Sequence, residues 1–146
     1  MIDYEARKKA AEVARRFVAG QITNFEFENC FPPSKDPAMW AIEDTLWCFY
    51  DDFEEHRLKD KWSVPGETKE LMIRWVMFLY SNKEYDWPKI SYPGVRPIQY
   101  GLFGKLFNRH KKQHDFLNSG EIEFWPFVSQ ESFEHAKQNP SLLAGS

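Results

Sequence analysis

The chain has 146 residues, a length typical of one domain that buries a single core. Hydrophobic residues make up 42% of it and aromatic residues 17%, which excludes global disorder. A net charge of −3 at pH 7 disfavours a dedicated nucleic-acid-binding protein. The only cysteines, Cys30 and Cys48, form no CxxC motif, so we expect a reducing compartment, the cytoplasm. No apolar run is long enough to span a membrane, and residues 1–21 lack the pattern of a signal peptide.

The charges are distributed very unevenly along the chain. Residues 36–60 contain eight acidic side chains and only two basic ones. Residues 89–114 contain six basic side chains and no acidic one. The two segments either neutralise each other inside the protein or give it one acidic and one basic surface.

Two helices are predicted near the N-terminus. Apolar residues at helical spacing predict a helix over 3–19, with Gly20 as its C-terminal stop and an outer face that carries Arg7 among other basic residues. Thr23 and Glu26 have the spacing of a capping box, which predicts a short helix over 24–29.

Asp36 followed by Pro37 has the pattern of a third helix start, and helical periodicity continues to Glu55. One face of this predicted helix is apolar, with Met39, Ile42, Leu46, Phe49 and Phe53. The opposite face carries acidic side chains, namely Asp44, Asp51, Asp52 and Glu55. Glu43 and Glu54 lie at the border of the apolar sector, where a carboxylate needs a partner.

Residues 67–80 are apolar on almost every side and predict the central helix of the fold, buried by its neighbours. Arg74 interrupts this segment and therefore needs an anion. We expect Arg74 to form a structural ion pair with Glu43 or Glu54.

The remaining segments complete the prediction of a mostly α-helical domain. The pattern predicts an ordered aromatic loop over 85–97 and a helix with a basic side over 98–117. It also predicts a short extended segment over 122–128. Ser129 caps a last helix that ends near Lys137, and 139–146 form a flexible tail. We expect one domain over 1–138, a bundle of five or six helices.

No complete catalytic, metal or nucleotide motif is present, so we predict no cofactor and no enzyme. His110 and His114 have the i, i+4 spacing of metal ligands, but the zincin glutamate and a third ligand are missing. An alternative is a small enzyme with a pocket near 96–114, in which one of these histidines is a base and Arg96 or Arg109 holds an anionic substrate. Another alternative is a nucleic-acid-binding module that uses the basic 96–112 segment, including Lys112.

The runs ITNFEFENCFP, DPAMWAI, LYSNKEYDWP and EFWPF resemble small helical bacterial proteins of uncharacterised families, and some such proteins are similar to immunity proteins of polymorphic or contact-dependent toxin systems. The resemblance covers patches between Gln21 and Phe127 and implies no catalytic residue. It implies a non-enzymatic protein whose partner is a basic toxin. The predicted partner-binding residues are Asp44, Asp51, Asp52 and Glu55, with Trp62 or Trp87 as aromatic anchors.

Overall fold

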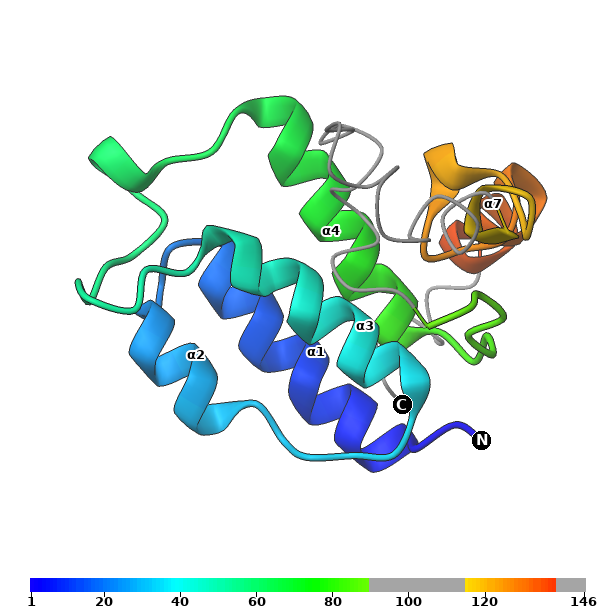
Figure 1. Cartoon of the computed structure of the whole chain (residues 1–146), viewed down its shortest axis with the longest axis horizontal. Coiled ribbons are helices and arrows are strands. Elements are labelled where there is room, and N and C mark those ends of the chain that lie inside the picture. The colour runs from blue at the N-terminus through cyan, green and yellow to red at the C-terminus, as the bar shows by residue number, and fades with distance from the viewer. Residues whose placement is uncertain (90–114, 139–146) are drawn as a thin grey trace, which may run out of the picture.

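The computed structural model describes residues 1–89 and 115–138, which fold mainly into helices and contain no strand (Figure 1). The mostly α-helical prediction is therefore confirmed. The helices are α1 (Tyr4–Val18), α2 (Asn24–Cys30), α3 (Pro37–Leu46), α4 (Gly66–Tyr80) and α7 (Gln130–Lys137). Three short 3-10 turns accompany them, η1 (Trp47–Phe49), η2 (Asp60–Trp62) and η4 (Ile122–Phe124).

The predicted starts of α2 and α3 and the predicted end of α1 are present in the structure. Thr23 and Glu26 form both hydrogen bonds of the capping box at the start of α2. The side chain of Asp36 accepts a hydrogen bond from the backbone N–H of Ala38, and Pro37 occupies the first position of α3. Gly20, after α1, has a φ of +71°, a conformation that glycine adopts without a steric cost.

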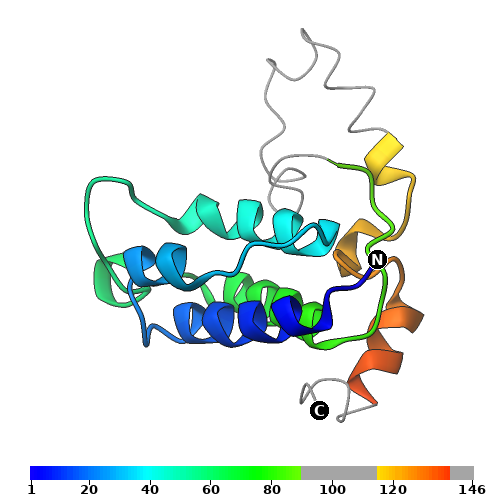
Figure 2. The same cartoon turned by 90° about the horizontal axis from the view of Figure 1, so that it is seen from below.

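Helices α1 and α4 lie side by side and form the largest helix contact of the described residues. Helix α3 packs on both of them, and Figure 2 shows it on one side of the layer that they form. Helix α2 contacts α1 and buries Phe27, which stacks on Phe17 at a centroid distance of 4.8 Å. The core thus lies among α1, α2, α3 and α4.

The C-terminal segment is attached to α4 by large aromatic side chains. Trp125 meets Trp75 edge to face at 5.8 Å, and Phe127 meets Phe78 at 5.0 Å. The indole N–H of Trp125 donates to the hydroxyl of Tyr85 at 3.1 Å. These contacts bury large apolar areas while satisfying the polar atom of the indole, the usual arrangement for a buried tryptophan.

The prediction of one helix over 36–55 is wrong. Helix α3 ends at Leu46, η1 follows, and Tyr50 has an extended backbone with φ −100° and ψ 138°. The carbonyl oxygens of Asp51 and Glu54 accept hydrogen bonds from the side chain of Asn24, so they are unavailable to a continuing helix. The extended piece predicted over 122–128 is likewise wrong at its start, where the turn η4 forms.

Arg7 does not belong to the exposed basic face on which the periodicity places it. It is 1% exposed and forms two parallel hydrogen bonds with Asp36, from Nε to Oδ2 at 2.6 Å and from Nη2 to Oδ1 at 3.1 Å. Its Nη1 donates to the carbonyl oxygen of Lys83 at 2.7 Å. One guanidinium therefore joins α1, the start of α3 and the segment after α4.

Candidate protein-binding surface

The segment that follows η1 is an irregular loop, residues 50–59, and Asn24 is its main attachment to the helices. The Asn24 amide nitrogen donates to the carbonyl oxygens of Asp51 at 2.8 Å and Glu54 at 3.2 Å. The Asn24 amide oxygen accepts from the backbone N–H of His56 at 2.8 Å. Asn24 is fully buried, so water does not compete for these hydrogen bonds. They therefore hold the loop in one conformation.

His56 provides a second attachment for the loop. Its side chain is buried, and its two ring nitrogens lie 3.1 Å from the carbonyl oxygens of Glu54 and Phe49. The imidazole also stacks on Trp62, with ring centroids 4.0 Å apart. Because carbonyl oxygens only accept, a neutral ring satisfies one of them and a protonated ring satisfies both.

At the tip of the loop the carboxylate of Asp51 closes a turn that exposes Phe53. Asp51 Oδ1 accepts hydrogen bonds from the backbone N–H groups of Phe53 at 2.7 Å and Glu54 at 3.0 Å. Phe53 is 98% exposed, in contrast to the apolar stripe to which its periodicity assigns it. A side chain of this size in water costs about 1.5–3 kcal/mol relative to burial, so its exposure needs an explanation.

Carboxylates contributed by α2, α3 and the loop lie near Glu43 and Tyr50 and act on their pKa values. Burial raises the pKa of Glu43, and the charges of Asp44 and Glu28 raise it further. A hydrogen bond to Glu28 raises the pKa of Tyr50 to about 12, with further contributions from burial and from the charges of Glu28 and Asp52. Part of each shift therefore comes from neighbouring negative charge, which a cationic partner would offset.

Aromatic rings lie beside these carboxylates. The hydroxyl of Tyr50 donates to Glu28 Oε2 at 2.6 Å, and its ring packs on Trp47 with centroids 4.3 Å apart. Both rings are half-buried. We name the following set the acidic aromatic surface: Glu28, Glu43, Asp44, Trp47, Tyr50, Asp52 and Phe53. It combines carboxylates with rigid aromatic side chains, the combination that binds basic protein surfaces.

The predicted partner-binding carboxylates have different environments. Asp44 is half-buried in α3, and Asp52 is exposed in the loop beside Phe53. Asp51 is occupied with the turn, and Glu55 accepts a hydrogen bond from the Thr23 hydroxyl at 2.7 Å. These carboxylates do not share the helix face expected for them, because α3 ends before three of the four.

The two predicted tryptophan anchors are not exposed side chains. Trp62 is half-buried and stacks on His56. Trp87 is 5% exposed, packs on Phe116, and donates its indole N–H to the carbonyl oxygen of Pro126 at 2.9 Å. The prediction that Trp87 is a surface anchor is therefore wrong, because its side chain is buried in the aromatic core.

The expected ion pair of Arg74 with Glu43 or Glu54 is not formed. Within residues 1–89 and 115–138, Arg74 has no carboxylate within ion-pair distance; its Nη1 donates to the carbonyl oxygen of Glu123, and its guanidinium lies 5.2 Å from the ring centre of Phe133. Glu54 instead pairs with Lys61 at 3.0 Å. The early end of α3 removes Glu54 from the helix on which the pairing depended.

Five members of the surface were not predicted as binding residues from the sequence, namely Glu28, Glu43, Trp47, Tyr50 and Phe53. A usable signal was present for Phe53, because the run DDFEE places it between four carboxylates. Burying Phe53 in a helix-packed core would bring some of these acidic neighbours into low dielectric. Glu28 and Tyr50 are 22 residues apart, and local periodicity cannot reveal their contact.

Several predictions concern residues that lie outside the described ranges, namely Arg96, Arg109, His110, Lys112, His114 and the tail 139–146. Among the described residues, no group of three or more His, Cys, Asp or Glu side chains could hold a metal ion. In the same part of the chain, no helix has the length and apolar character that crossing a membrane requires. Comparison with family models, with curated proteins and with solved structures finds no match.

Proposed function

We propose that this chain is a non-enzymatic protein-binding module and that its acidic aromatic surface binds a basic protein. The observation that carries the proposal is Phe53, an almost fully exposed aromatic side chain on a loop that Asn24 and His56 hold in place. Because the loop backbone is already held, presenting this aromatic side chain to a partner's pocket requires little further ordering of the loop.

The electrostatic part of the proposal rests on the carboxylates of the acidic aromatic surface. A surface of negative charge accelerates the encounter with a positively charged partner and rejects acidic ones. The pKa of Glu43, which burial raises and to which the charges of Asp44 and Glu28 add, supports the presence of several negative charges near this residue. Binding a cationic side chain there would remove part of this repulsion.

The partner class follows from the sequence resemblance. Immunity proteins bind their cognate toxins without chemistry, and many secreted toxins are nucleases with basic clefts for nucleic acid. We propose that the partner is a basic toxin of this kind and that the acidic aromatic surface covers its cleft.

The test compares three tagged baits in lysate of the native host. The first is the natural chain, the second carries Asp52→Lys and Phe53→Ser, and the third carries Tyr4→Ser and Glu131→Lys as a control with the same change in charge and aromatic content. Tyr4 and Glu131 are exposed and lie outside the acidic aromatic surface. Asp51 and Glu55 are left intact because they hydrogen bond within the loop and to Thr23.

We expect one basic protein in stoichiometric amounts with the natural chain and the control, and its loss with the Asp52→Lys/Phe53→Ser bait. Capture of the same protein by all three baits would contradict the assignment of the surface. Capture of nothing by any bait, in cells shown to produce the toxin class, would contradict the proposed function.

A further inference from the structure

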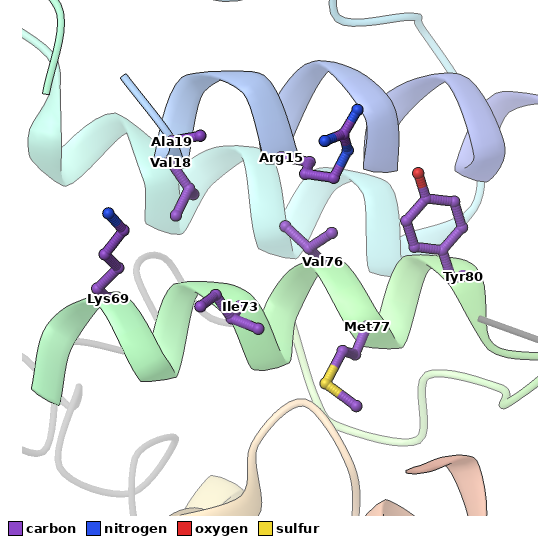
Figure 3. A pocket seen from close by; sticks show the side chains of 8 residues that line it. All are labelled: Arg15, Val18, Ala19, Lys69, Ile73, Val76, Met77 and Tyr80. Carbon is purple, nitrogen blue, oxygen red and sulfur yellow. The ribbon is translucent and has the colours of Figure 1, made fainter. Parts of the chain in front are cut away.

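A second feature of the molecule shares no residue with the acidic aromatic surface. Between α1 and α4 lies a groove with a volume of about 340 Å³ (Figure 3). Its apolar lining includes Val18 of α1 together with Ile73, Val76 and Met77 of α4. Arg15, Lys69 and Tyr80 also line the groove, almost entirely through their carbon atoms, so that their polar groups lie at its margins.

The groove exists because one stripe of α4 is only partly covered. Lys69, Ile73, Val76, Met77 and Tyr80 recur at spacings of three and four residues and so lie along one side of the helix. The sequence predicts that neighbours bury α4 on every side. Ile73 is nevertheless 47% exposed, and Met77 is half-buried.

The polar groups of the groove are not equivalent. Arg15 is neutralised by Glu12, with Nη2 and Oε1 2.8 Å apart, and the Tyr80 hydroxyl lies 3.4 Å from the same carboxylate. No described residue forms an ion pair with Lys69. In Figure 3, Lys69 stands at one end of the groove, and Arg15 and Tyr80 lie toward the other.

We propose that this groove binds a free single-chain amphiphile with one carboxylate head group. The chain lies on Val18, Ile73 and Met77, and the carboxylate meets the ammonium group of Lys69. Small-molecule sites of this kind have volumes of roughly 300–1,000 Å³, a mostly apolar lining and a few polar groups that fix orientation. The observed groove meets the conditions of volume and apolar lining, and Lys69 at one end supplies the group that would fix orientation.

The chemistry of the lining argues for an anion rather than a cation. A cationic head group at Lys69 would face like charge, and at the other end the Glu12 carboxylate already binds Arg15 and Arg16. A neutral chain would gain the apolar contacts alone. An anionic amphiphile gains both the apolar burial and the charge interaction with Lys69.

The experiment titrates the full chain with decanoate below its micelle concentration and follows the methyl NMR signals of Ile73 and Met77. Decyltrimethylammonium serves as the cationic control and decanol as the neutral one. We expect saturable shifts with decanoate and an affinity about threefold or more above that of decanol, the size of an exposed charge interaction. Lys69→Gln removes this preference, whereas Lys35→Gln, at an exposed lysine outside the groove, preserves it.

A second variant keeps the proposal testable independently of charge. Ile73→Gln replaces a half-exposed side chain without adding charge and leaves the core intact, so its unfolding temperature checks the fold while the decanoate shifts of the Met77 methyl signal disappear. The proposal is overturned by the absence of saturable shifts, by equal affinities for the three amphiphiles, or by a Lys69→Gln variant that keeps the preference. It is also overturned if the methyl signals depend on protein concentration without ligand, because a second copy of the chain then occupies the groove.

Discussion

Arg7 and Asp36 form a buried ion pair that joins three parts of the chain. Both side chains are 1% exposed, and the guanidinium binds the carboxylate through two nitrogens. Asp36 also accepts hydrogen bonds from the backbone N–H groups of Asp3 and Ala38, each at 3.0 Å. Removing one partner of such a pair leaves a buried charge without compensation, which is costlier than removing both.

We predict that Arg7→Met lowers the free energy of unfolding by about 3–5 kcal/mol. The double variant Arg7→Met/Asp36→Asn should lose clearly less than the sum of the two single variants, because neither charge is then left alone. Urea unfolding of the four proteins measures this coupling. Additive losses would show that the pair is not the interaction that the structure indicates.

The same pair makes stability depend on pH. Burial alone raises the pKa of Asp36, but the hydrogen bonds from Arg7 and from the Asp3 amide outweigh it, and the pKa is lowered on balance. The folded state thus has a lower pKa than the unfolded chain, whose aspartates titrate near about 3.9. The contribution of Asp36 is complete above that pH and is lost as the pH falls toward the lowered value.

We therefore predict that the stability difference between the natural chain and Asp36→Asn shrinks as the pH falls below about 4. Using the difference cancels the other carboxylates, including Glu43, whose pKa is raised and whose effect has the opposite sign. Thermal unfolding at a series of pH values gives the measurement. A difference that is constant across the acid range would contradict the assigned direction.

At the scale of helices and loops, Arg74 connects α4 to the C-terminal segment without a carboxylate. Its Nε is buried and has no hydrogen-bond partner among residues 1–89 and 115–138. Burial lowers the pKa of Arg74, and the charge of Glu70 acts in the opposite direction. What it gains is a hydrogen bond to the Glu123 carbonyl oxygen and contact with the rings of Phe124 and Phe133.

We predict that Arg74→Met changes stability by no more than about 1 kcal/mol, because an apolar side chain of similar length keeps the packing and removes the desolvation of the charge. Coupling between Arg74 and Glu43 should be close to zero in a double-mutant cycle. Arg74→Ala is the comparison that loses the packing and should be the less stable variant. A coupling above about 1 kcal/mol would restore the ion pair inferred from sequence.

The elements that the sequence predicted well are those with local signals. The starts of α2, α3 and α7 follow from capping residues within a few positions, and Gly20 marks the end of α1 through its positive φ. The end of α3 depended on Asn24, 27 residues before Asp51, and no helical wheel contains that information. The sequence likewise could not show that one side of α4 is exposed. Periodicity shows that a helix face is apolar, but it does not show whether a neighbouring element covers that face.

At the scale of the molecule, the structure assigns contacts to several of the acidic residues in 36–60. Some of the carboxylates serve the fold, as Asp36 does with Arg7 and Glu54 with Lys61. In the acidic aromatic surface, burial and the charges of Asp44 and Glu28 raise the pKa of Glu43, and Glu28 and Asp52 contribute to the raised pKa of Tyr50. The sequence analysis placed the acidic residues on one helix and the aromatic anchors on tryptophans, because it could not locate the turn that exposes Phe53.

The most direct measurement is the binding kinetics of the purified basic partner at low and high salt, for the natural chain, Asp52→Lys and Phe53→Ser. We predict that the association rate of the natural chain falls at least about tenfold with rising salt. We also predict that Asp52→Lys slows association and that Phe53→Ser mainly speeds dissociation, with a loss of affinity of about tenfold or more. Unchanged kinetics in both variants and no dependence on salt would contradict the assignment of this surface as the binding site.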